Sequence, residues 1–240
     1  MDGPAVSPAG DGRVLPWRQL LAALVAVSAA LTLTSYVTLE LVDHRFFQVG
    51  GGGHAYLNVG VEGNIPTWWS ASVLVAGATV TVMLAWLLRS QRLAGVWPTA
   101  AIAALLLAFS LDELVALHEH LHRVGRLLVS AETLPFVWLA VGIPLALGVG
   151  VVAVLLARRV PAAVRPLLLG GLAVFFTGAV GLELVGSQLH GDGGVQSPAA
   201  VAVYHLEELL EMTGAALMAV APLRAVRVTG PGTTLRVAVS

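Results

Sequence analysis

The chain has 240 residues, of which 57% are hydrophobic and 11% are charged. Soluble domains carry about 25% charged residues, so this composition excludes an ordinary soluble protein and indicates an integral membrane protein. The formal net charge of −1 gives no basis for binding nucleic acid. Cysteine and lysine are absent, which excludes disulfides, thiolate metal sites and a lysine Schiff base.

Six apolar runs, each close to the ~20 residues that cross a bilayer, follow one another along the chain. We predict spans at 17–42, 68–88, 94–117, 134–156, 167–185 and 199–223. The polar, Gly- and Pro-rich residues 1–16 are expected to be a disordered tail. Residues 17–223 then form the transmembrane domain, and residues 224–240 form a C-terminal tail. The predicted fold is all-α, a six-helix membrane bundle.

The arginines predict how this bundle is oriented. Ten of them lie in the two tails and in the loops after the second and fourth spans, whereas only Arg45, Arg123 and Arg126 lie in the other loops. Arginine and lysine concentrate on the cytoplasmic side of membrane proteins. Both termini are therefore expected in the cytoplasm, in a bacterial plasma membrane, with the loops after spans one, three and five facing outward.

The tripeptide Glu-Leu-Val occurs three times, beginning at Glu40, Glu113 and Glu183, at intervals of about 70 residues. A histidine follows each copy; the three are His44, His118 and His190. This period predicts three repeated helical hairpins. The alternative is coincidence, because Leu and Val are abundant in the chain.

The last predicted span contains Glu207, Glu208 and Glu211 near its middle. A charged carboxylate at the centre of a bilayer costs roughly 2.5–3.5 kcal/mol on insertion scales. These acids must therefore be neutralised by protons, by histidine or by a bound cation.

Further ligand-type residues are spaced at helical intervals. On one predicted helix, Asp112 and Glu119 are two turns apart, and Glu119-x-x-His122 has the i,i+3 carboxylate–imidazole spacing of di-metal sites in helical bundles. In the last span, His205-x-x-Glu208 has the same spacing reversed. Carboxylate oxygen and imidazole nitrogen together suit borderline divalent metals.

The outer half of the predicted bundle holds nine carboxylates against three arginines. These acids are Glu40, Asp43, Asp112, Glu113, Glu119, Glu183, Glu207, Glu208 and Glu211. We predict a site there, facing the extracytoplasmic side, for one or two divalent metal ions such as iron, zinc or manganese. The candidate ligands are Asp112, Glu113, His118, Glu119, His122, Glu183, His205, Glu208 and Glu211. The pattern assigns no catalytic side chain.

The segments Ser110-Leu-Asp112-Glu113 … His118-Glu119 and Glu207-Glu208-x-x-Glu211-Met212-x-Gly214 resemble those of a set of bacterial multi-pass membrane proteins without an assigned activity. The resemblance covers two short segments. It implies a polar core made of Asp112, Glu113, His118, Glu119, Glu208 and Glu211, and it implies no reaction.

Three functions are compatible with the sequence. The first is a metal-dependent membrane enzyme acting on a lipid or another hydrophobic substrate. The second is a proton or divalent-cation transporter that uses the intramembrane glutamates. The third is a non-catalytic membrane subunit or scaffold whose acids are protonated. Membrane lipid is the expected surrounding partner in each case.

Overall fold

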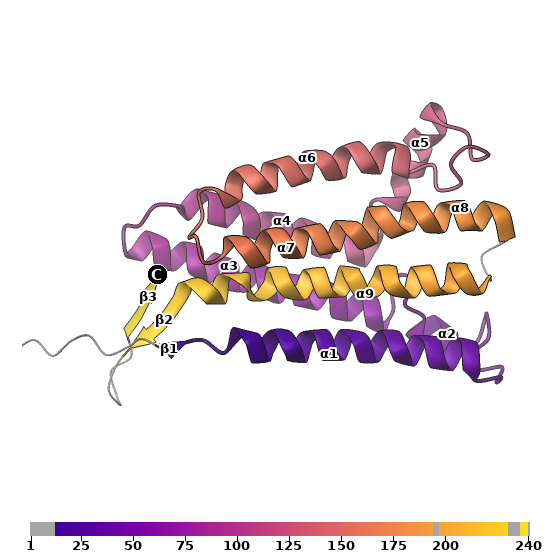
Figure 1. The fold of residues 1–240 in the computed structure, drawn as a ribbon, viewed down its shortest axis with the longest axis horizontal. Helices are drawn as coiled ribbons and strands as arrows, with labels where there is room; N and C mark the ends of the chain where they lie inside the picture. Colours follow the sequence, from indigo (N-terminus) through magenta and orange to yellow (C-terminus); the bar gives the residue numbers. More distant parts are fainter. Residues whose placement is uncertain (1–12, 194–196, 230–235, 240) are drawn as a thin grey trace, which may run out of the picture.

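The structure, a computed structural model, describes residues 13–193, 197–229 and 236–239. Long helices run side by side along the longest axis of the molecule (Figure 1). Five helical segments are long and apolar enough to cross a membrane: Trp17–Leu41, Ile65–Ser90, Val96–Val115, Leu139–Ala157 and Arg165–Leu189. They indicate a multi-pass integral membrane protein, and they overlap the first five predicted spans.

The helices that make up these segments differ in regularity. Two segments contain a π-helical stretch, which is rare and often lies at functional sites. The first is α1 (Trp17–Tyr36) with η1 (Val37–Leu41), and the fifth is α7 (Arg165–Phe176), η3 (Thr177–Leu182) and α8 (Glu183–Gly193). The others are α3 (Ile65–Ser90), α4 (Val96–Val115) and α6 (Leu139–Ala157). Short helices α2 (Gly52–Leu57), η2 (Glu119–Leu121) and α5 (His122–Leu128) lie in the connections.

A sixth long helix, α9 (Pro198–Val220), contains the three glutamates of the last predicted span. It lies between α1 and α7 in Figure 1 and packs against α1, α3, α7 and α8. A helix therefore occupies most of the last predicted span, but α9 is not among the five segments that are apolar enough to cross a membrane.

Capping residues explain where two of the helices begin. The Asn64 side chain accepts a hydrogen bond from the Thr67 N–H at 3.1 Å, and Pro66 follows in the first turn of α3. Ser197 accepts from the Ala200 N–H at 3.2 Å at the start of α9, where Pro198 follows. The polar cap at Asn64 starts α3 three residues before the predicted boundary at Trp68.

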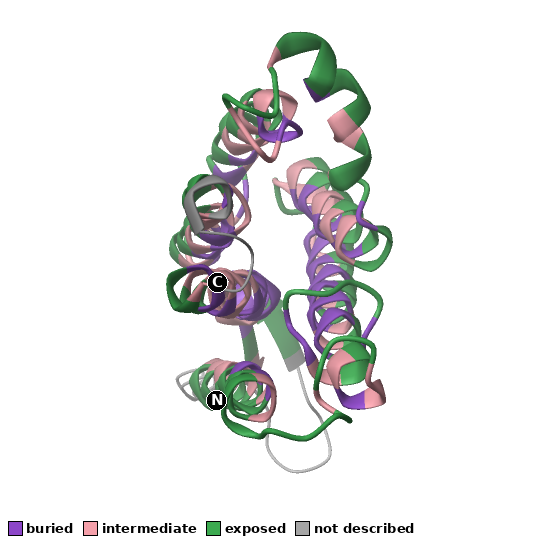
Figure 2. Cartoon of the chain, turned by 90° about the vertical axis from the view of Figure 1, so that its right-hand side faces the viewer, coloured by how far each residue is buried: buried purple, intermediate pink, exposed green. Residues whose placement is uncertain are grey.

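Small residues bring α9 close to its neighbours. A Cβ atom added to Gly77 of α3 would lie 2.7 Å from the Ala219 Cα. One added to Gly214 of α9 would lie 2.6 Å from the Phe175 N and 2.7 Å from the Gly171 O. The backbones approach closely there, as small residues at helix–helix contacts in membrane proteins allow. Figure 2 shows buried residues mainly toward the middle of the bundle.

A small antiparallel sheet joins the two chain ends, in the order β1 (Arg13–Val14), β2 (Val226–Thr229), β3 (Arg236–Val239). Arg13 pairs with Val228, and Val226 pairs with Val239. Arg13 and Val14, within the predicted tail 1–16, form β1; residues 1–12 lie outside the described residues. We call the opposite end of the bundle, where α2 and α5 lie, the distal end (Figure 1).

Candidate metal centre

The distal end of α4 is the point at which the candidate site begins. The helix ends at Val115 because Ala116 adopts a left-handed conformation (φ 48°). Left-handed residues commonly end helices, although glycine usually occupies that position. The turn brings His118 back beside the last turn of α4. Its backbone N–H donates to Asp112 Oδ1 at 2.8 Å, and its Nδ1 lies 3.0 Å from Asp112 Oδ2.

This turn corrects the helical reading of the sequence. Asp112, Glu119 and His122 were expected on one face of one continuous helix. Instead, Glu119 lies in η2 and His122 starts α5, so the i,i+3 spacing between them does not belong to one α-helix. The His122 Nδ1–H donates to the Glu119 carbonyl at 2.7 Å.

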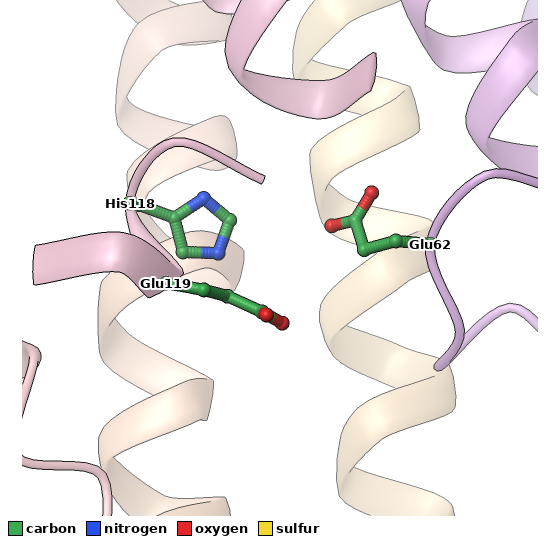
Figure 3. Close-up of side chains that lie close together, drawn as sticks. All are labelled: Glu62, His118 and Glu119. Atoms are coloured by element: carbon green, nitrogen blue, oxygen red, sulfur yellow. The ribbon is translucent and has the colours of Figure 1, made fainter. Parts of the chain in front are cut away.

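Three side chains at the distal end could hold a metal ion. Glu62, His118 and Glu119 each offer one ligand atom, and these atoms all lie within 4.8 Å of one another. Figure 3 shows the three side chains converging from two separate segments, the loop before α3 and the turn after α4. Two carboxylates and one imidazole form a donor set that suits zinc, iron or manganese.

Asp112 determines which nitrogen of His118 faces this group. A carboxylate can only accept hydrogen bonds, so Nδ1 carries the hydrogen and Nε2 is left to bind a metal. Figure 3 shows the second ring nitrogen on the side of Glu119 and Glu62. A carboxylate that holds a metal-binding histidine in this way fixes its ring and raises its basicity.

Glu62 was missed at the sequence level because it lies in a loop. The Asn64 amide donates to the carbonyls of Asn58 and Val61 and so folds the loop around Glu62. The Val59 N–H donates to Ser35 Oγ of α1 at 3.1 Å. The first contacts are local to the loop and the second depends on the tertiary fold, so helical spacing gave no signal for this residue.

Burial and neighbouring charges shift the pKa values of Glu62 and His118. Partial burial, followed by the charge of Glu113, raises the pKa of the Glu62 carboxyl to about 7. Burial lowers the pKa of His118, but the hydrogen bond and charge of Asp112 outweigh it and raise that pKa to about 9. Without a metal, a positive imidazole therefore lies among the carboxylates.

Trp138 and Glu183 extend the site toward α6 and α8. The Trp138 Nε1–H donates to Glu183 Oε1 at 2.8 Å, and the Trp138 and His118 ring centroids are 4.8 Å apart. Glu183 thus lies behind the tryptophan, and its carboxyl already has a protein donor.

The remaining predicted acids lie deeper in the bundle. Glu113 of α4 and Glu208 and Glu211 of α9 are half-buried, and their carboxyl groups interact electrostatically. Glu113 lies against Glu211 and Ser70. Glu113 is close enough to Glu62 for its charge to act on that carboxyl.

His205 is buried on the side of α9 that faces α1. Its Nδ1–H donates to the Val201 carbonyl at 2.8 Å, so Nε2 accepts from the Ser35 hydroxyl at 3.1 Å. Both ring nitrogens are therefore used within the protein. The structure places this histidine as a link between α9, α1 and the Glu62 loop.

The three Glu-Leu-Val copies have different local structures. Glu40 lies in η1 and is exposed, Glu113 lies in α4, and Glu183 follows η3. His44 is exposed, and the side chain of His190 lies outside the described residues. The hairpin repeat stays a prediction.

Comparison with known proteins identifies a family for the chain. No curated protein and no solved structure matches it. The profile of a family described as a domain of unknown function (DUF8692) matches residues 18–226. Because this match covers most of the chain, the protein belongs to that family.

Proposed function

We propose that this protein is a metal-dependent membrane enzyme that binds one divalent cation through Glu62, His118 and Glu119. The observation that carries the proposal is the convergence of these three ligand atoms within 4.8 Å, with Asp112 holding the His118 ring. Structural metal sites usually fill all positions with protein ligands, whereas catalytic sites use three and leave one for water or substrate.

The surroundings of the site favour a lipid or another hydrophobic substrate. Apolar side chains close to it in sequence are strongly exposed, with Leu117 at 49%, Leu127 at 84% and Leu128 at 65%. Arg123 and Arg126, on the same short helix α5, are exposed as well. A short amphipathic segment of this kind suits the headgroup boundary of a membrane.

The proposed orientation puts the distal end outside the cytoplasm. It follows from the ten arginines on the side of the termini and the three on the other side. A metal at the site would polarise a substrate oxygen or lower the pKa of a bound water. The chain's own residues would hold the metal at the depth of the lipid headgroups.

Elemental analysis and calorimetry of the detergent-purified protein test the metal site. We expect about one equivalent of zinc, iron or manganese per chain, and Glu62→Gln should weaken binding by at least about a hundredfold. Glu132→Gln is the matched control, because Glu132 is an exposed acid of the α5–α6 connection. An unchanged metal affinity in Glu62→Gln would contradict the proposed metal site.

The proposed enzymatic activity needs a separate measurement. The metal-loaded protein is incubated with a bacterial lipid extract, and the lipids are compared by mass spectrometry with those from Glu62→Gln. A product that requires both metal and Glu62 supports the proposal. A lipid profile identical for both proteins, with metal bound to the parent, would argue against an enzyme of lipids.

Cation transport is the second candidate, because acids continue from the distal end as far as Glu211 near the middle of α9. Beyond Glu211 the same helix is closely packed, with Ala215, Ala216 and Met218 at most 1% exposed. Metal flux into proteoliposomes that disappears in Glu211→Gln would favour transport over the enzyme. A scaffold would neither bind metal nor carry flux.

A further inference from the structure

An apolar groove of about 810 Å³ lies between α6 and the segment formed by α7 and η3. Its wall on α6 extends from Ile143 to Arg158, and every lining residue except Arg158 and Thr177 is apolar or glycine. The Thr177 hydroxyl donates to the Ala173 carbonyl at 2.8 Å. Arg158 therefore supplies the one charged group of the groove, and it does so at the end of α6 that lies toward the chain termini (Figure 1).

The packing of α6 explains why this groove is open. The buried residues of the helix are Leu139 and Gly142 near its start and Ala153 and Ala157 near its end. The stretch between them, residues 143–152, contains no buried residue and forms one wall. The π-helical segment η3 contributes to the opposite wall, and such segments often lie at functional sites.

Two glycines leave space in the groove. A Cβ atom added to Gly150 of α6 would meet nothing within 4 Å, and one added to Gly181 of η3 would have its nearest neighbours at 3.9 Å. Both residues line the groove. They differ from Gly214, which allows two backbones to touch, because here the absent side chains leave room for another molecule.

Charge at the mouth of the groove indicates what this molecule is. The connection at residues 157–166 contains Arg158, Arg159 and Arg165 and no acidic residue. The ion pair among the described residues joins His118 and Asp112, so Arg158 has no acidic partner there. Arginine at the end of a membrane span lies at the level of the lipid headgroups, and its guanidinium binds phosphate well.

The size of the groove fits one lipid. From Ile143 to Arg158 is 15 positions, roughly 22 Å along the helix at 1.5 Å per residue. This length exceeds half of the ~30 Å hydrocarbon core of a bilayer, so an acyl chain of one leaflet can lie along it. The volume is also typical of sites for a single small ligand, which are mostly apolar with a few polar groups that fix its orientation.

We propose that this groove binds an anionic phospholipid, with one acyl chain between α6 and η3 and the phosphate at Arg158. The lipid comes from the leaflet on the side of the chain termini, which is cytoplasmic in the proposed orientation. The site is thus distinct from the Glu62 group at the distal end and goes beyond the proposed enzymatic function.

Native mass spectrometry of the full chain, after removal of metal by a chelator, tests the headgroup contact. Dioleoyl-phosphatidylglycerol is compared with the zwitterionic dioleoyl-phosphatidylcholine. We expect one phosphatidylglycerol per chain, bound about fivefold more tightly than phosphatidylcholine, the effect of one arginine near an anionic membrane surface. Arg158→Gln should remove this preference. Arg159→Gln is the matched control, because Arg159 is also exposed but does not line the groove.

Gly150→Leu tests the acyl-chain contact by filling the groove. It should weaken the binding of both lipids by roughly tenfold, a typical effect of overpacking. Gly148→Leu is the control, since Gly148 lies on the same helix, is exposed, has equally free space around its Cβ and does not line the groove.

Three results would overturn the lipid site: equal binding of the two lipids to the parent, equal effects of Arg158→Gln and Arg159→Gln, or equal effects of Gly150→Leu and Gly148→Leu. A dimer of the parent that Gly150→Leu dissociates would also overturn it and would assign the groove to a second copy of the chain. Because the measurement is made without metal, failure of the Glu62 site leaves all these expectations unchanged.

Discussion

Asp112 and His118 are joined by two hydrogen bonds across the end of α4, one to the backbone N–H at 2.8 Å and one to Nδ1 at 3.0 Å. The same carboxylate therefore stabilises the left-handed turn at Ala116 and orients the imidazole toward Glu62 and Glu119. Helix termination and site geometry depend on one residue.

Asp112→Asn should weaken metal binding at Glu62, His118 and Glu119 by about tenfold to a hundredfold, as is typical when the partner of a metal-binding histidine is lost. An amide carries no charge and can present its NH₂ to the ring, so His118 loses its fixed orientation. Calorimetry with Zn²⁺ measures the effect. Asp43→Asn is the control, since Asp43 is exposed and accepts from Gln48 Nε2; equal loss in both variants would contradict the role of Asp112.

Removing the metal should lower thermal stability. A ligand present at about 100 times its dissociation constant stabilises the folded protein by about 2.7 kcal/mol. Thermal unfolding of the purified protein, with excess Zn²⁺ and after chelation, measures the difference. The shift should be absent in Glu62→Gln, and an equal shift in that variant would place the stabilising metal elsewhere.

His205→Leu should reduce stability without removing a metal ligand. Leucine cannot accept from Ser35, whose hydroxyl also accepts from the Val59 N–H in the loop that leads to Glu62. Loss of a buried hydrogen-bonding partner costs about 1–3 kcal/mol. Denaturant unfolding measures this cost, with Leu206→Ala, an exposed neighbour, as the control. We expect metal stoichiometry to stay at that of the parent; its loss would make His205 a ligand after all.

The spanning helices could be predicted because their signal is local. An apolar run of sufficient length, bounded by polar caps such as Asn64 and Ser197, is written in consecutive residues. The acids of α9 could also be recognised, because charge is rare in such runs.

The geometry of the group formed by Glu62, His118 and Glu119 could not be predicted in the same way. No glycine marks the turn at Ala116, so the sequence reads as a continuing helix through Glu119. Glu62 joins the group only because Asn64 and Ser35 fold its loop against the bundle. The helical spacing rule placed Glu119 with Asp112 and His122, whereas the structure brings it beside Glu62 and His118.

Gly178→Ala should lower stability, because the added methyl group would overlap the Glu207 carbonyl and the Glu211 stem. Relief requires η3 and α9 to move apart, and overpacking of this kind typically costs about 1–3 kcal/mol. Gly181→Ala in the same π-helical segment is the matched control, since its nearest neighbours would lie 3.9 Å away. Thermal unfolding of the two variants makes the comparison. Because both carry the same substitution in η3, a loss of stability confined to Gly178→Ala would locate the effect at the contact with Glu207 and Glu211, whereas equal losses would assign it to the general helix propensity of η3.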